Sequence, residues 1–423
     1  MREKLAIIGT GIAAMGTAHF LHKQYDVHLF EKADYVGGHT NTVDVKEGGR
    51  TVPIDTGFIV YNEVNYPYLT RLFNELSVPV KNSNMSFSVQ YKPTGLEFCG
   101  SGISGLFCQK KNFLSPNFYR LLYNINRFNQ EAPKILDNPK YESYTLAQFI
   151  EEFSYHEDML HRYLIPMSSA VWSTPINKMM SFPAATLIRF FHNHGFLGLN
   201  TQHQWKTVVN GSRSYADIIT RPFRDKIRLN SGIEKVRREK GVVKLVYKGG
   251  LEEVFDKVVL ACHADTSLSL LENPSGLETE LLRDFHYETN TATLHTDTSV
   301  MPKTRSAWSS WNYSVEKSTG GEWADSNIIY WMNSLQGVSD TVNYFVSIND
   351  PGLVRKEHII KNIQYDHPLF TPETARAQKQ LPQLNQQGDI FYCGSYFRYG
   401  FHEDAFMSAV DLSRVLSKEP IWN

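Results

Sequence analysis

The chain has 423 residues, a formal net charge of −1 at pH 7 and an aromatic content of 13%. This length is enough for roughly two or three domains with a large buried core, and the balanced charge provides no basic surface for nucleic acid. The four cysteines lack C-x-x-C spacing, and no apolar run reaches the ~18 residues of a membrane-spanning helix. The first strand begins at about Leu5, which leaves no room for a signal peptide. We therefore expect reduced thiols and a cytoplasmic protein.

The N-terminal residues alternate between strand and helix patterns around a glycine motif. The apolar run Leu5–Ile8 predicts a strand, Ala13–Leu21 a helix, and Val27–Phe30 a second strand that ends on Glu31. The segment Gly9–Ala14, between the first strand and the helix, has the form G-x-G-x-x-A. The order of strand, motif, helix and strand is typical of a dinucleotide-binding unit.

The positions of this motif have separate physical roles in binding a dinucleotide. Gly9 allows the tight turn, Gly11 lets the backbone approach a pyrophosphate, and Ala14 keeps the helix close to the sheet. The helix N-terminus offers its free N–H groups to the phosphates. Glu31 lies 22 residues after Gly9, the usual distance for an acid that binds the adenosine ribose hydroxyls. A βαβ turn with tight packing and no ligand is the alternative interpretation.

The residues after Glu31 select the cofactor. Gly37-Gly38-His39-Thr40 and Val52–Val60, which contains Gly57, resemble motifs of the two-dinucleotide-binding flavoproteins, the family of monoamine oxidase, phytoene desaturase and protoporphyrinogen oxidase. The resemblance implies that the first segment contacts the ribityl–pyrophosphate part of FAD and that the second passes the isoalloxazine ring. It also implies an α/β fold, with a Rossmann-like FAD-binding domain and an inserted α+β substrate domain.

The resemblance covers the whole chain and implies a discontinuous layout. The FAD-binding domain would take residues 1–83, 206–275 and 386–423, and the substrate domain residues 84–205 and 276–385. Residue patterns predict helices over 66–76, 116–131, 145–153, 156–165 and 184–194, and a helix near 354–363. They predict strands over 86–90, 242–247, 291–295, 327–331 and 341–348.

The C-terminal residues resemble the last flavin motif of the same family. A strand, Asp389–Cys393, ends on Gly394, and a helical pattern runs from near His402 to Leu416. In the family, the glycine meets the ribityl chain and the helix N-terminus points at the flavin, where its positive dipole end stabilises the anionic reduced form. A protonated His402 would add to that positive charge. Ser395 stands where family members usually have Asp or Glu, so this chain departs from the pattern there.

The predicted cofactor contacts come from these motifs, together with the backbone of Ile233 near the adenine. We expect FAD to be bound non-covalently. Candidate residues for catalysis are His402, Tyr399 and Trp172, with the flavin N5 as the reactive centre. The predicted FAD contacts are Gly9, Gly11, Ile12, Ala13, Ala14, Glu31, Lys32, Gly37, Gly38, His39, Thr40, Gly57, Phe58, Ile59, Ile233, Gly394, Ser395, Phe401, His402 and Glu403.

The closest resemblance is to a bacterial subgroup of NAD/FAD-binding proteins, through Asp55–Asn62, Met167–Thr174, Ala307–Asn312 and Tyr399–Asp404. Genes of this subgroup often neighbour those of cyclopropane-fatty-acid synthase-like methyltransferases.

Three functions follow as hypotheses. The first is an oxidase or desaturase that moves hydride from a hydrophobic substrate, such as an acyl lipid, to flavin N5. The second is a flavin amine oxidase, and the third a flavin-binding accessory protein for a lipid-modifying methyltransferase.

Several residues bear on the substrate and the partners. Thr291–His295 carries no Lys, although amine oxidases usually place one on the matching strand, and Phe401 falls where they place a cage Tyr. Both favour an acyl chain over an amine.

Residues 103–134 mix apolar and basic side chains, which fits either a helix packed on its own core or a peripheral membrane contact. A second nucleotide motif is missing, so oxygen or a quinone is the expected electron acceptor. His192, His194 and His203 lack ligand spacing, and no metal site is predicted.

Overall fold

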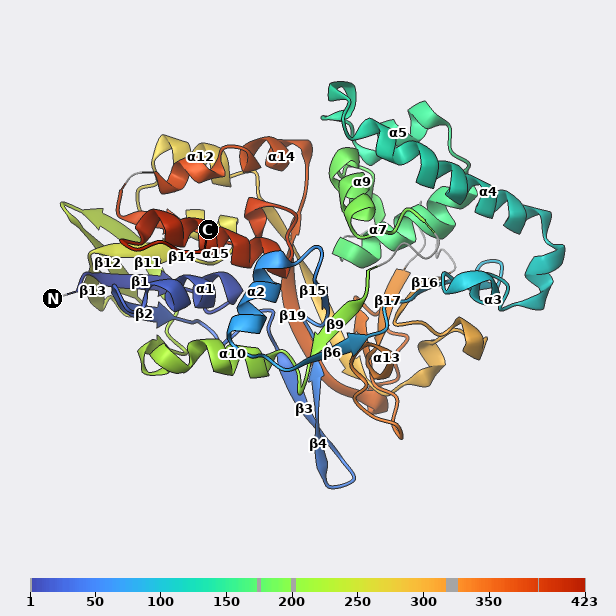
Figure 1. Cartoon of the computed structure of the whole chain (residues 1–423), viewed down its shortest axis with the longest axis horizontal. Helices are drawn as coiled ribbons and strands as arrows, with labels where there is room; N and C mark the ends of the chain where they lie inside the picture. The colour runs from blue at the N-terminus through green and yellow to red at the C-terminus, as the bar shows by residue number, and fades with distance from the viewer. Residues whose placement is uncertain (1, 173–175, 199–202, 317–325, 387, 423) are drawn as a thin grey trace.

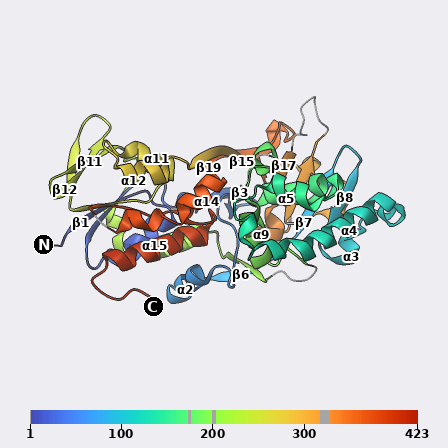
Figure 2. The same ribbon diagram turned by 90° about the horizontal axis from the view of Figure 1, so that it is seen from above.

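The computed structural model describes residues 2–172, 176–198, 203–316, 326–386 and 388–422. The molecule is elongated and has two lobes (Figure 1). One lobe carries the N-terminus and strands β1 and β2, and the other carries helices α3, α4, α5, α7 and α9. The view from above shows the same division along the long axis (Figure 2).

The first lobe is built on a five-stranded parallel sheet with the order β10-β2-β1-β14-β20. The central strand β1 (Lys4–Ile8) is buried from Leu5 onward, as expected for a strand covered on both faces. The strand order reverses between β1 and β14, and open parallel sheets bind ligands at the carboxyl ends of the strands at such a point. The other strands are β2 (Asp26–Phe30), β10 (Ile227–Arg228), β14 (Lys257–Leu260) and β20 (Ile390–Tyr392).

Helices α1 (Ile12–Leu21) and α15 (His402–Leu416) pack against each other on this sheet. The contact requires glycine at position 16, because a Cβ there would lie 2.8 Å from the ring of Phe406. The other helices of the lobe are α2 (Pro67–Glu75), α10 (Arg213–Thr220), α11 (Ala264–Leu270), α12 (Gly276–Leu282) and α14 (Pro372–Gln378).

Helices α12 and α14 differ from the predicted layout. Residues 276–385 were expected in the substrate domain, but Leu281 and Leu282 of α12 and Ala377 of α14 share a core with Ile8 and Leu260 of the parallel sheet. The two helices also lie over the first lobe in Figure 1. Their apolar faces are buried in the core of the first lobe, so the ends of the predicted segment pack with the first lobe and its middle part with the second.

Three small sheets complete the frame. Strands β11 (Ile233–Glu239), β12 (Val242–Tyr247) and β13 (Glu252–Phe255) form an antiparallel meander. Strands β3 (Thr42–Glu47) and β4 (Arg50–Asp55) form a hairpin that projects from the molecule (Figure 1). The third sheet has the order β5-β9-β6 and joins β5 (Tyr61–Asn62), β6 (Val80–Ser83) and β9 (Trp205–Val208).

The second lobe contains a seven-stranded sheet with the order β19-β15-β18-β17-β16-β7-β8. Strands from two distant parts of the sequence meet in it, because β16 pairs in parallel with β7. A helix was expected near 354–363, and this prediction is wrong: residues from Ile359 onward pair antiparallel with β15. The strands are β7 (Phe87–Tyr91), β8 (Leu96–Cys99), β15 (His286–His295), β16 (Trp311–Val315), β17 (Ser326–Trp331), β18 (Phe345–Ile348) and β19 (Ile359–Leu369).

Helices cover one side of this sheet. The helix predicted over 116–131 is confirmed as α4 (Pro116–Glu131), whose N-cap Ser115 accepts a hydrogen bond from the Phe118 N–H. The helix predicted over 156–165 is instead divided by a π-helical turn at Leu160–Leu164. The helices are α3 (Gly102–Leu106), α5 (Leu146–Phe153), α6 (Glu157–Met159), α7 (Ile165–Trp172), α8 (Ile176–Met179), α9 (Ala184–Asn193) and α13 (Met332–Gln336). None of the described helices is long and apolar enough to cross a bilayer.

Candidate functional site

The glycine motif forms an open cradle at the carboxyl end of β1. Gly9 has a φ of +108°, and a Cβ there would lie 2.6 Å from the carbonyl oxygen of Ala261, so no other residue fits the turn. Gly11 is different, because an added Cβ would meet no atom within 4 Å. Gly11 is also the N-cap of α1 and provides no side-chain cap, so the first N–H groups of α1 face this open space. The cradle fits a pyrophosphate.

The second glycine pair packs against this cradle. Gly37 and Gly38 have φ values of +129° and +59°, and a Cβ on Gly38 would lie 3.4 Å from the Cα of Gly11. The Gly37 N–H donates to the Thr10 hydroxyl at 3.3 Å. The structure thus brings the two glycine segments together beside one helix N-terminus.

Glu31 lies at the other side of the cradle. It is buried, and its carboxylate accepts hydrogen bonds from the Thr10 N–H at 3.0 Å, the Thr10 hydroxyl at 2.6 Å and the Ala33 N–H at 2.9 Å. The loop before β11 lies alongside, because the Ser231 N–H donates to the Glu31 carbonyl at 2.8 Å. Lys32, Ile233 and Glu31 are therefore neighbours, which suits the adenosine end of the cofactor.

Three distant segments meet at the opposite end of the site. The Phe58 N–H donates to the His39 carbonyl at 2.7 Å, and a Cβ on Gly57 would lie 2.2 Å from the same oxygen. The ring of His402, the first residue of α15, stacks on Phe58 with centroids 3.8 Å apart and an interplanar angle of 10°. Ile59 follows in the same segment, and its carbonyl accepts a hydrogen bond from Thr207 at 2.8 Å. This juxtaposition suits the flavin end of the cofactor.

Tyr215 connects His402 to the second glycine segment. Its hydroxyl lies 2.5 Å from Nε2 of His402 and 2.5 Å from the Thr40 hydroxyl. Burial lowers the pKa of His402 to about 3, so the imidazole is neutral at pH 7. His402 therefore adds no positive charge at pH 7. Any positive potential at this point comes from the N-terminus of α15 itself.

Glu403 has a role other than the predicted cofactor contact. Its buried carboxylate accepts hydrogen bonds from the backbone N–H groups of Tyr68 at 2.8 Å and Leu69 at 2.9 Å, in the first turn of α2. Glu403 thus caps α2 and fixes it against α15. Burial raises the pKa of this carboxyl to about 7.

A Glu403→Gln variant is expected to change how stability depends on pH. The unfolded carboxyl titrates near its ordinary value of 4.5 and the folded one near about 7, so the folded state binds more protons between these values. Raising the pH through this window therefore destabilises the wild type relative to the variant. Urea unfolding midpoints measured from pH 5 to pH 8 would show this change: any excess of the wild-type midpoint over that of the variant becomes smaller, or reverses, as the pH rises. Glu280→Gln, on the exposed side of α12, is the control, and parallel curves for all three proteins would contradict the expectation.

The strand-end glycine of the C-terminal motif is held by α15. The Gly394 N–H donates to the Ser408 hydroxyl at 2.8 Å, and a Cβ on Gly394 would lie 2.6 Å from the ring of Tyr396. The Ser395 carbonyl accepts hydrogen bonds from the N–H groups of Arg398 and Gly400, both at 3.2 Å. Ser395 therefore builds the turn that leads into α15.

The three catalytic candidates lie close together. Nε1 of Trp172, at the end of α7, donates to the Tyr399 carbonyl at 3.2 Å. The Trp172 ring lies 5.9 Å from that of Phe401, which stacks on Phe190 at 4.7 Å, and His402 follows Phe401 directly. Trp172 thus joins α7 of the second lobe to the C-terminal motif of the first.

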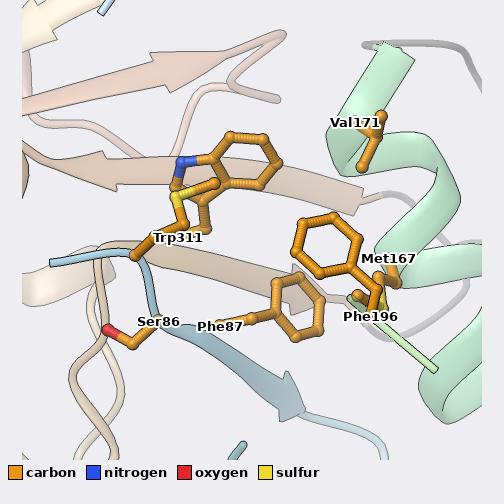
Figure 3. Close-up of a pocket in the computed structure, with 7 residues that line it drawn as sticks. Ser86, Phe87, Met167, Val171, Phe196 and Trp311 are labelled. Atoms are coloured by element: carbon orange, nitrogen blue, oxygen red, sulfur yellow. The ribbon is translucent and has the colours of Figure 1, made fainter. Parts of the chain in front are cut away.

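An apolar pocket lies beside α7 (Figure 3). Met167 and Val171 project from α7 toward Phe87 of β7 and Trp311 of β16. Among the described lining residues, Ser86 is the polar one, and none is charged. The lining residues are Met85, Ser86, Phe87, Met167, Val171, Phe196 and Trp311.

Sequence reasoning missed several residues of this site. Tyr215 lies on α10, far from any motif, and nothing in its local pattern marks it. His263 and His367 lie near the second glycine segment, and the His367 ring is 5.3 Å from that of His39. Burial lowers the pKa of His39, and the nearby His367 and His263 lower it further. The position of His263 just after β14, at the carboxyl end of a strand beside β1, was a usable signal. Within the described parts of the chain, no three His, Cys, Asp or Glu gather as metal ligands would.

Together these features define the class of protein to which the chain belongs. A parallel sheet with a reversal of strand order, an open glycine cradle, an acid at the adenosine side and a second helix N-terminus at the far end describe a dinucleotide-binding flavoprotein. The family model described as flavin containing amine oxidoreductase matches residues 15–347. The chain belongs to this family, and it is an FAD-dependent oxidoreductase.

Solved structures share the fold over nearly the whole chain. Cyclohexylamine oxidase from Brevibacterium oxydans IH-35A is similar with a TM-score of 0.71 and 15% identity, covering 98% of this chain and 100% of its own. Wild-type putrescine oxidase bound to putrescine has a TM-score of 0.70 and 12% identity, with 98% and 99% covered. A CLA-producing fatty acid isomerase from P. acnes has a TM-score of 0.67 and 14% identity, with 97% of each chain covered. No curated protein matches the chain.

Proposed function

We propose that this oxidoreductase acts on a hydrophobic substrate of the acyl-lipid class, bound in the pocket between α7 and the seven-stranded sheet. The lining of this small pocket supports the proposal, because its described residues include two methionines, three aromatic side chains and a valine, with no charged group among them to receive an ammonium. Flexible Met side chains suit chains of variable shape. FAD, when bound, supplies the chemistry by accepting a hydride.

Helix α7 both lines the pocket and contacts the C-terminal motif, which supports this proposal. Val171 lines the pocket, and the next residue, Trp172, bonds to the Tyr399 carbonyl beside Phe401. Phe401, Phe190 and Trp172 form an apolar wall rather than a polar cage. In this arrangement α7 orients the substrate and the aromatic wall excludes water from the reacting end.

The strand that carries a Lys in amine oxidases supports the same substrate class. His295, at the end of β15, is buried and its Nε2 lies 2.8 Å from the Ser347 hydroxyl. Its surroundings lower its pKa to about 4, mainly through burial, so it is neutral at pH 7. No side chain of Thr291–His295 is a Lys that could position a proton-accepting water.

Amine oxidation is the second candidate. Putrescine oxidase and cyclohexylamine oxidase share the fold, as does a fatty acid isomerase. The neighbours therefore include proteins named for both substrate classes. A flavin-binding accessory protein without turnover is the third candidate, and the same experiment separates all three.

The test is anaerobic mixing of the holoprotein with acyl lipids, both unsaturated and methyl-branched, and with a panel of amines. We expect lipids to bleach the flavin absorbance and simple amines to leave it unchanged. Bleaching by amines alone would replace the proposal with amine oxidation. If neither the lipids nor the amines bleach the flavin, and FAD is firmly bound, the result would favour the accessory protein. Addition of oxygen or of a quinone to the reduced protein then identifies the acceptor, for which we propose one of these two.

A pocket variant sharpens this test. Val171→Asp places a carboxylate among apolar side chains, and we expect lipid-dependent bleaching to slow by about tenfold or more, because the charge must be desolvated when the chain enters. Val415→Asp, on the exposed side of α15, is the matched control. Equal bleaching rates in the two variants, with FAD retained in both, would show that the substrate does not use this pocket.

A further inference from the structure

The end of the second lobe exposes apolar side chains to solvent. Leu114 is 89% exposed, Ile103 72%, Tyr123 68% and Phe113 52%. Five of the twelve large hydrophobic side chains that are exposed in the described chain lie within residues 103–123. Such a concentration differs from the scattered exposed residues of an ordinary surface.

We term the apolar side chains of this region that reach solvent the α3–α4 tip: Ile103, Phe107, Phe113, Leu114, Tyr119 and Tyr123. The Phe107 ring stacks on Phe113 with centroids 4.2 Å apart and lies 5.9 Å from Tyr119. The Tyr119 hydroxyl donates to the Phe113 carbonyl at 3.1 Å. Tyr123 lies one turn further along the same face of α4.

The segment that forms the tip carries charged side chains of one sign. Residues 98–130 contain Lys110, Lys111, Arg120 and Arg127 and no acidic residue. Arg120 is neutralised by Asp158 of α6, at 3.0 Å, and Arg127 by Glu131 at 3.0 Å. Lys110 and Lys111 are exposed in the segment between Phe107 and Phe113, and Lys111 donates to the Gly95 carbonyl at 2.7 Å.

A neighbouring loop adds to this positive charge. The Glu97 carboxylate of β8 accepts hydrogen bonds from the backbone N–H groups of Lys303 at 2.8 Å and Thr304 at 2.9 Å. This contact holds the exposed Lys303 and Arg305 beside β8, the strand that leads into α3. Glu157 of α6 is an exposed acidic residue next to α4, and its charge opposes this positive charge.

We propose that the α3–α4 tip docks on an anionic lipid bilayer surface. Aromatic and aliphatic side chains that project beside lysines match an interface where apolar groups enter the acyl boundary and ammonium groups meet lipid phosphates. The tip lies at the end of the long axis opposite the N-terminus in both views, so the molecule can meet a flat surface with it (Figures 1 and 2). The docking is independent of the substrate and of turnover.

The experiment is co-sedimentation of the holoprotein with phosphatidylcholine vesicles that do or do not contain phosphatidylglycerol. We expect binding to the mixed vesicles only, and a loss of about tenfold or more in apparent affinity for Leu114→Glu and for the double variant Lys110→Glu/Lys111→Glu. Leu251→Glu is the matched control, because Leu251 is 75% exposed between β12 and β13 in the other lobe. Flavin absorbance and unfolding midpoints of all variants report that the fold is intact.

The outcomes separate the proposal from its rivals. Sedimentation that Leu114→Glu reduces and Leu251→Glu leaves unchanged supports docking. Failure of the wild type to bind the mixed vesicles overturns it, as does equal binding by both Leu→Glu variants. A concentration-dependent dimer that the tip variants abolish, without vesicle binding, would assign the tip to a second copy of the chain and overturn the lipid proposal.

Discussion

A Gly11→Val variant is expected to fold normally and to purify without FAD. A Cβ at this position meets no protein atom within 4 Å, and the φ of −63° is ordinary, so the chain itself tolerates a side chain there. The open space is the cradle at the N-terminus of α1. Filling it prevents the backbone N–H groups from reaching a pyrophosphate, and charge-assisted bonds of this kind contribute ~1.5–3 kcal/mol each. With two such bonds lost, FAD affinity should fall by at least about 100-fold.

The measurement is the flavin absorbance of the purified variant, followed by titration of the protein with FAD. Gly276→Val is the matched control, since Gly276 begins α12, lacks a positive φ and also has no atom within 4 Å of an added Cβ. We expect the control to retain FAD. Gly9→Val, in contrast, should fail to fold, because its Cβ overlaps the Ala261 carbonyl. A Gly11→Val protein that remains yellow would contradict binding at this cradle.

An Asp55→Leu variant is expected to lose about 3–6 kcal/mol of stability, because several buried donors lose their acceptor at ~1–3 kcal/mol each. The fully buried Asp55 carboxylate accepts hydrogen bonds from the Thr42 hydroxyl at 2.5 Å, from the N–H and hydroxyl of Ser212 at 2.9 and 2.8 Å, and from Gln336 at 2.6 Å. These donors come from β3, from the residue before α10 and from α13 of the second lobe. Asp55 therefore joins three separate segments.

Loss of Asp55 should also weaken FAD binding, although Asp55 is not itself at the cradle. Ser212 precedes α10, which carries Tyr215 and so holds Thr40 and His402 in place. Urea unfolding and FAD titration measure the two effects. Asp44→Leu is the control on the neighbouring strand: Asp44 pairs with Arg213 at 2.8 Å, but it is largely exposed, and such pairs contribute only ~0–1 kcal/mol. Equal midpoints for the two variants would contradict the role given to Asp55.

The sequence alone predicted the local parts of this protein. The strand, glycine motif, helix and acid over residues 5–31 follow from short-range rules of turn geometry and helix N-termini, and the structure has them where expected. The same holds for α4 and for α15, whose apolar periodicity and flanking residues mark their ends. The FAD cofactor followed from the resemblance of motifs that are contiguous in the chain to those of a flavoprotein family.

Only the tertiary structure decided features that depend on contacts between distant residues. Residues from Ile359 form a strand because β15 supplies its hydrogen bonds, and the local pattern did not show this partner. His402 is neutral because Phe58 and Tyr215 surround it, and Glu403 turns away to cap α2 because that helix packs against α15. Burial and partners set protonation and side-chain direction, and both arise from segments far apart in the sequence. The apolar pocket likewise exists only where α7 meets β7 and β16.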